Sequence, residues 1–170
     1  HFTPGFERNL SDELARSIAA KGGVVQITFG TGFVNRQAAD DLQAYFSAEA
    51  ALDGRNAAAR AAGKPLEDKD AFDAEWKRTH PAPATPIEAV LDQVDYAVKL
   101  IGIDHVGLGS DFDGVSGNLP EGLRNVADYP NLIAGLQARG YKDGDLKKFL
   151  GGNLLRVWAA VEAGSQQPKP

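Results

Sequence analysis

The chain has 170 residues, of which 43% are hydrophobic and 24% charged, so it is long enough for one domain with a buried core. Its formal net charge of −5, with no basic run to offset it, argues against nucleic acid or an anionic membrane as the main partner, because both bind basic surfaces. The sequence has no cysteine, which excludes disulfides, thiolate nucleophiles and cysteine metal ligands.

The apolar runs and the first residues leave the compartment open. The longest apolar runs are too short to span a bilayer. The chain opens on His-Phe-Thr-Pro-Gly, without a charged and then apolar leader, so we expect no signal peptide within it and a natural N-terminus elsewhere.

The first predicted element is a short amphipathic helix that begins after Ser11. A serine suits the N-cap position, and the two acidic residues that follow it favour the positive end of the helix dipole. Leu14 and Ile18 form the apolar face, and the glycines at 22–23 end the helix.

Two short apolar runs predict strands. Val24–Phe29 is β-branched and bounded by glycines, with residues 30–32 as its exit loop, and His105–Gly109 is the second run. A helix followed by a strand, and later repeated, is typical of a parallel sheet, so the fold class is α/β. Two parallel strands cannot cover their own edges. Either further strands are hidden in the sequence or the chain is one section of a larger β/α body, and we favour the second.

The middle of the chain is predicted to be helical and then irregular. Residues 35–62 are rich in alanine and predict a helix with a buried stripe of Leu42, Tyr45 and Phe46. Residues 63–86 are charged and proline-rich, and we interpret them as an excursion with a short helix over 70–78.

A strong helix start follows this excursion. Thr85 suits the N-cap, Pro86 the first helical position and Glu88 the residue that reaches back to the cap. The helix ends at Gly102, and its apolar face recurs at helical spacing. The residues of that face are Ile87, Val90, Leu91, Val94, Val98 and Ile101. Further helices are predicted over 130–138, 143–150 and 153–163, and residues 164–170 are predicted to form a disordered tail.

The most informative segment is Gly102–Gly114, in which the second strand ends abruptly in Ser-Asp-Phe-Asp-Gly. A carboxylate just past a buried strand can bind a metal, take a proton or hold a substrate amine, because the chemistry of α/β sheets and barrels lies where strands end. The alternative is that Asp111 caps a turn before Gly114, and the spacing does not separate the two. A calcium loop is excluded, since its glycine would be sixth rather than fourth and its twelfth residue acidic.

Few other residues offer chemistry. Arg8 can grip a carboxylate through a bidentate contact, although a solvated surface arginine is the commoner case. His105, inside the predicted second strand, is expected to be packed, and His80, in a proline-rich loop, is expected to face solvent. No serine lies on a nucleophile elbow, and no glycine-rich stretch has the lysine or the spacing of a phosphate loop.

Several blocks, taken in order, resemble the membrane (renal) dipeptidase family of zinc peptidases in its bacterial form. The blocks are Glu7–Leu14 (ERNLSDEL), Ala19–Ile27 (AAKGGVVQI), Ile103–Val115 (IDHVGLGSDFDGV), Pro120–Leu123 (PEGL), Tyr129–Ile133 (YPNLI) and Gly152–Val157 (GNLLRV). The ordered set spans nearly the whole chain and is more specific than any one block. Residues 35–85 match weakly and look like a lineage insertion.

The resemblance implies the C-terminal part of a (β/α)8 TIM-type barrel. Val24–Phe29 would be the seventh strand and His105–Gly109 the eighth, so the N-terminal section of the same barrel would be a required partner. The domain would cover residues 1–163, with 35–85 as a helical and loop insertion. Asp111 would then lie at the C-terminal mouth of the barrel, where barrel enzymes carry their chemistry.

The resemblance also implies roles for individual residues. Arg8 matches the arginine that grips the free carboxylate of the dipeptide. Asp111 matches the aspartate beside the metal centre that handles the substrate amine or the proton, and Asp113 and Gly114 would shape its loop. The family's metal ligands lie on earlier strands, and its last histidine ligand lies further upstream of the arginine than His1, so no metal ligand is expected in this chain.

The implied activity is hydrolysis of a dipeptide by water that two zinc ions activate. A homodimer is left open. So are two other interpretations, a catalytically inactive or accessory family member with a binding or biosynthetic role, and another metal-dependent amide hydrolase on the same barrel. Relatives often carry histidines within Asp92–Tyr96, where this chain has Gln93 and Tyr96, with no clear functional consequence.

Overall fold

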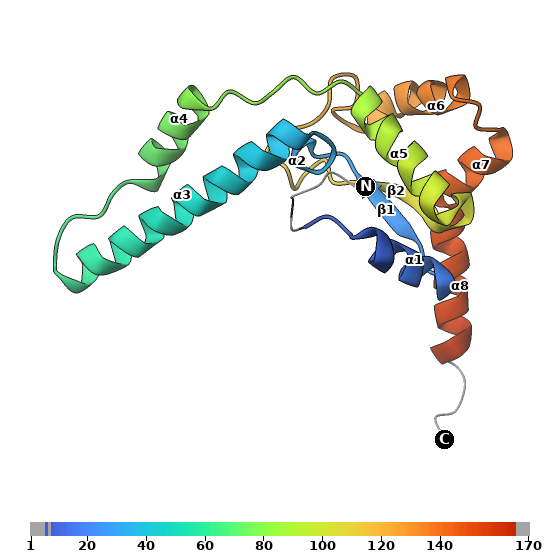
Figure 1. Ribbon diagram of the computed structural model, residues 1–170, viewed down its shortest axis with the longest axis horizontal. Coiled ribbons are helices and arrows are strands. Elements are labelled where there is room, and N and C mark those ends of the chain that lie inside the picture. Colours follow the sequence, from blue (N-terminus) through green and yellow to red (C-terminus); the bar gives the residue numbers. More distant parts are fainter. Residues whose placement is uncertain (1–5, 7, 166–170) are drawn as a thin grey trace.

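The computed structural model describes Phe6 and residues 8–165. Two parallel strands lie side by side in its body, with helices around them (Figure 1). The elements in chain order are α1 (Asp12–Ala20), β1 (Val25–Thr28), α2 (Thr31–Val34), α3 (Arg36–Ala61), α4 (Lys69–Thr79), α5 (Glu88–Ile101), η1 (Ile103–His105), β2 (Val106–Ser110), η2 (Val126–Asp128), α6 (Tyr129–Ala138), α7 (Asp143–Lys147), η3 (Lys148–Gly152) and α8 (Asn153–Ser165). The α/β class is confirmed.

The sheet consists of β1 and β2, which pair in parallel from Val25 opposite Val106. The register shifts near the carboxyl ends, where Thr28 pairs with Ser110 and Gly109 is left as an extra residue. A Cβ at position 109 would lie 2.8 Å from the carbonyl oxygen of Ile27, so this bulge requires glycine. Each observed strand differs from its predicted bounds by one residue at both ends, and residues 31–34 form a helical turn rather than a loop.

The core lies between the sheet and three helical segments, α5, α6 and η3. The fully buried side chains of this core include Phe29, Val90, Val94, Val106, Leu132, Leu136 and Phe149. Burial of each such side chain stabilises the fold by about 1.5–3 kcal/mol. The predicted apolar face of α5 is confirmed, since Val90, Leu91 and Val94 are buried in the core.

Hydrogen bonds from α8 hold the end of the sheet at which both strands begin. The side chain of Asn153 donates to the carbonyl oxygens of Ile103 (2.6 Å) and Val106 (2.8 Å). Arg156 donates to the carbonyl oxygens of Gly22 and Asp104, which precede β1 and β2. His105 is not inside the second strand as predicted. It lies in the 3₁₀ turn before it, half-buried, with Nδ1 2.8 Å from the Gly23 carbonyl oxygen.

The long helix α3 and the shorter α4 form an arm that extends away from the sheet (Figure 1). Lys69 of α4 contacts Glu49 (2.9 Å) and the Tyr45 hydroxyl (2.6 Å) of α3, and it also pairs with Asp73 (2.6 Å) on its own helix. The predicted buried stripe is wrong. Tyr45 and Leu42 are half-buried and Phe46 is exposed, because α4 covers one part of α3 only. The buried residues of α3 are Ala38, Ala39 and Leu52.

The two predicted helix starts had different outcomes. Ser11 caps α1 as expected, with its hydroxyl accepting from the Leu14 amide (3.2 Å). The predicted cap of α5 is wrong, because that helix begins at Glu88 and Thr85 bonds elsewhere. The Thr85 hydroxyl accepts from Asn35 Nδ2 (3.0 Å) and donates to the Pro83 carbonyl oxygen (3.2 Å). A long-range contact has replaced the local capping bond.

The C-terminal helices form one kinked run. α7 continues through the π-helical turn η3 into α8, and Gly151 (φ 157°) makes the kink. Gly164 and Ser165 belong to α8, so the predicted tail is wrong there, and residues 166–170 lie outside the described residues. Of the helices that the structure describes, none combines the length and apolar character needed to cross a bilayer.

Candidate active-site edge of the sheet

Asp111 and Arg8 lie at the same edge of the sheet. Asp111 directly follows β2, and the guanidinium of Arg8 lies over the ring of Phe33, in the turn α2 that follows β1. The Phe29 amide donates to the Ser110 carbonyl oxygen (2.8 Å), which holds the two strand exits together. Because β1 and β2 are parallel, both residues lie at the carboxyl edge, where α/β proteins place their chemistry.

Asp111 has a backbone conformation that is uncommon for any residue other than glycine. Ser110 (φ 56°) and Asp111 (φ 71°) are both left-handed, and such strained residues cluster at functional sites. Within the described residues, the carboxylate of the half-buried Asp111 makes no hydrogen bond to the backbone. It lies instead against Gly114, where a Cβ would overlap Oδ1.

An aromatic cluster anchors the loop that carries Asp111. The ring of Phe112 lies 5.7 Å from that of Phe29 and 5.7 Å from that of Tyr129, between centroids. Phe29 is fully buried, so Phe112 is tied to the core. Asp113 is exposed.

Arg8 is exposed, and its guanidinium carbon lies 5.0 Å from the centroid of the Phe33 ring. This distance is within the range of a cation–π contact. Among the residues that the structure describes, no carboxylate forms an ion pair with Arg8.

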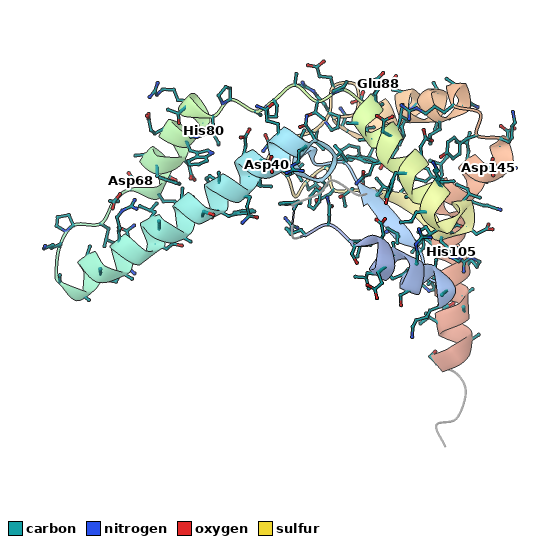
Figure 2. The ribbon with its side chains drawn as sticks, in the orientation of Figure 1. Asp40, Asp68, His80, Glu88, His105 and Asp145 are labelled. Atoms are coloured by element: carbon teal, nitrogen blue, oxygen red, sulfur yellow. The ribbon has the colours of Figure 1, made fainter. Side chains whose placement is uncertain are left out.

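The described residues do not form a metal centre by themselves. No three histidine, aspartate or glutamate side chains gather among them. Figure 2 shows His80 on the arm and His105 on the far side of the body, so these two cannot share a metal. His80 is exposed as expected and stacks on Trp76 at 3.9 Å, and His1 lies outside the described residues.

Gln93 and Tyr96 connect α5 to its neighbours. The Tyr96 hydroxyl donates to Asp12 (2.6 Å) at the start of α1, and Gln93 donates to the carbonyl oxygen of Phe33 (3.4 Å). Burial is the larger cause and the hydrogen bond to Asp12 the second, and together they raise the pKa of Tyr96 to about 12. The Tyr96 hydroxyl therefore remains a hydrogen-bond donor at neutral pH. Both residues have structural contacts in this chain.

A cavity of about 280 Å³ at the same edge was not foreseen from the sequence. Its lining includes Thr31, Pro83, Thr85, Asn118, Glu121 and Arg124. These residues come from three segments that only the fold brings together. The Thr31 amide, for example, donates to the Asn118 carbonyl oxygen (2.9 Å). No local pattern in the sequence could have identified this cavity.

Comparisons with known proteins give a consistent result. The family model for membrane dipeptidases (peptidase family M19) matches residues 5–169. An uncharacterized protein in the pqqA 5′ region of Klebsiella pneumoniae is 35% identical over 150 residues, which are 88% of this chain and 40% of that protein. Dipeptidase aclJ of Aspergillus oryzae is 47% identical over 88 residues, which are 52% of this chain and 21% of that protein.

Two solved structures are also similar. The probable dipeptidase PvdM from Pseudomonas aeruginosa has a TM-score of 0.63 and 28% identity, over 89% of this chain and 40% of that one. A metallo peptidase from Rhodobacter sphaeroides, liganded with a phosphinate mimic of the dipeptide L-Ala-D-Ala, has a TM-score of 0.56 and 27% identity, over 86% of this chain and 30% of that one. The chain spans less than half the length of each of these relatives.

Proposed function

This chain belongs to the membrane dipeptidase family (peptidase family M19), and on that premise we propose that the protein encoded by the complete reading frame is a zinc-dependent dipeptidase. The observation that carries the proposal is the position of Arg8 and Asp111 at one carboxyl edge of a parallel strand pair. A cation and a carboxylate at one edge suit a substrate with a free carboxylate at one end and an amine at the other.

Arg8 is the proposed site for the substrate's free carboxylate. A bidentate contact between a guanidinium and a carboxylate contributes roughly 1.5–3 kcal/mol. This contact explains a preference for dipeptides, because a longer peptide places its terminal carboxylate too far from the bond to be cut. The phosphinate mimic of L-Ala-D-Ala in the Rhodobacter sphaeroides structure supports a substrate of this size.

Asp111 is the proposed residue for the substrate amine or for the proton that moves during hydrolysis. The contact between its carboxylate and Gly114 supports a loop shaped to hold Asp111, with Asp113 at the exposed end. The zinc ligands are proposed to lie on polypeptide outside this chain, as the family resemblance implies.

The exposed apolar surface supports an incomplete barrel. On α8, Leu155 is 67% exposed, Trp158 60% and Val161 65%, and on α1 Leu14 is 49% exposed. These two helices, which contact β1 and β2, therefore present apolar side chains to solvent, and a complete domain would bury such side chains. In this proposal β1 and β2 are the seventh and eighth strands of the barrel, residues 1–163 belong to it, and 35–85 are an insertion.

The proposal predicts different kinetic effects for the two residues. In the protein as encoded, Arg8→Ala should raise KM for dipeptides by about 10-fold to 150-fold, the equivalent of the lost carboxylate contact. Asp111→Asn should lower kcat by about 10²-fold to 10⁴-fold, as expected for loss of a proton-transfer group. Steady-state hydrolysis of a panel of dipeptides measures both constants.

Arg36→Ala is the matched control, because Arg36 is an exposed arginine on α3 that pairs with Asp40 (3.1 Å). Metal analysis of every variant, with the assay repeated after chelation, separates the other interpretations. A protein without bound metal would favour an accessory role. Bound metal without turnover of any dipeptide would favour another amide hydrolase. Unchanged KM in Arg8→Ala would rule out its assigned role.

A further inference from the structure

We propose that Phe33 is a positioning residue that holds the guanidinium of Arg8 toward the substrate carboxylate. This inference rests on the proposed dipeptidase function. The guanidinium carbon of Arg8 lies 5.0 Å from the centroid of the Phe33 ring. An exposed arginine has many side-chain conformations, and a ring beneath the guanidinium favours a few of them before substrate arrives.

The Phe33 ring is itself held in place. Phe6, which is buried, meets the ring edge-to-face with centroids 5.2 Å apart and an interplanar angle of 75°. Phe6 and Arg8 are close neighbours in sequence, so one short segment contributes both the buried support and the exposed cation. The ring therefore has a fixed orientation relative to Arg8.

The backbone of Phe33 is fixed from the same segment and from α5. Asn9 donates from its side chain to the Phe33 carbonyl oxygen (3.1 Å), and Gln93 donates to the same oxygen (3.4 Å). The Asn9 amide in turn donates to the Phe6 carbonyl oxygen (3.0 Å), which closes the turn that contains Arg8. In the sequence, Arg8 thus lies between Phe6 and Asn9, and both of these residues contact Phe33.

Phe33 also lies next to the loop that carries Asp111. A Cβ at Gly30 would lie 2.7 Å from Val115 and 3.1 Å from the Phe33 ring, so a glycine between them lets the ring and this loop approach. The ring that lies under Arg8 is therefore close, through Gly30, to the residues that follow β2. Recognition of a substrate as short as a dipeptide requires a fixed distance between the guanidinium of Arg8 and the loop that carries Asp111.

Replacement of the ring tests this role in the protein as encoded. Phe33→Leu should raise KM for dipeptides by about 3-fold to 30-fold, the range of a cation–π contact, with kcat within about twofold of the unaltered protein. Phe33→Tyr keeps the aromatic face and should retain the original KM. Phe72→Leu is the matched control, because Phe72 also lies under a cation (Lys69 at 5.6 Å) but on the arm, and its KM should not change.

A double-mutant cycle separates positioning from general damage. If Phe33 acts through Arg8, Phe33→Leu should raise KM no further when Arg8 is already alanine. An additional rise in that background, or a rise in Phe72→Leu as large as in Phe33→Leu, would overturn the inference. If Arg8→Ala raises KM and Phe33→Leu does not, this inference fails while the proposed function stands. If the unaltered protein hydrolyses no dipeptide, the proposed function itself fails.

Discussion

Asp111 illustrates how one residue departs from what its local sequence favours. An aspartate before Phe-Asp-Gly commonly caps a turn, yet its carboxylate makes no such bond within the described part of the chain. The left-handed conformations of Ser110 and Asp111 persist because Phe112 is anchored in an aromatic cluster on one side and the bulge at Gly109 lies on the other. The surrounding structure therefore holds strained residues at the strand end.

Gly114 offers a test of this arrangement. Its φ is not left-handed, so Gly114→Ala should be tolerated by the backbone and should disturb only the Asp111 carboxylate that lies against it. We expect kcat for dipeptides to fall at least about 10-fold, because a displaced proton-transfer group loses much of its effect. Gly144→Ala, at a site with open space around the missing Cβ, is the control. Equal kcat in both variants would contradict the proposed role of Gly114.

The elements show where local signals were sufficient and where they failed. Ser11 caps α1 through a bond three residues away, and such a bond depends on local sequence alone. Thr85 satisfies the same pattern, but its hydroxyl bonds to Asn35, fifty positions distant. A competing long-range partner cannot be read from a window of a few residues. The same reason explains Phe46, because Phe72 and Trp76 of α4 contact the adjacent Tyr45 while Phe46 stays exposed.

Asn153, in the Gly152–Val157 block (GNLLRV), is explained by its structural hydrogen bonds rather than by a catalytic role. Asn153 is 3% exposed and bonds two carbonyl oxygens, so Asn153→Ala should lower the free energy of unfolding by about 1–3 kcal/mol, the cost of buried acceptors left without a donor. Asn131→Ala removes one bond at an exposed site, to the Gly122 carbonyl oxygen, and should cost less than about 1 kcal/mol. Urea unfolding of both variants measures the difference, and similar losses would refute this explanation.

At the level of the whole molecule, the two ends of the arm lie together. Asn35, just before α3, bonds to Thr85 (3.0 Å) near the start of α5, although the chain between them extends far from the sheet (Figure 1). This geometry supports residues 35–85 as an insertion into the surrounding fold. A segment with adjacent ends can be shortened at a small cost in loop-closure entropy.

Removal of the arm tests that interpretation. Replacement of residues 44–81 by a Gly/Ser linker of about ten residues keeps the start of α3, where Ala38 and Ala39 are buried, and should leave the protein as encoded soluble and folded, with dipeptide hydrolysis retained. The far-UV circular dichroism spectrum should lose helix signal in proportion to the number of residues removed from α3 and α4. Thermal unfolding should remain one cooperative transition. Loss of cooperative unfolding would indicate that the arm belongs to the core structure.

Taken alone, the sequence determined the strands, most of the helices and the residues that were candidates for chemistry. Those features depend on short-range patterns such as the β-branched run at Val25–Thr28 and the apolar face of α5. The fold decided which candidates lie at the same end of the sheet. Arg8 and Asp111 share an edge, and His105 lies at the opposite end of the strand, because parallel pairing sets all carboxyl ends on one side. Pairing between distant segments is a three-dimensional property, so no local pattern encodes it.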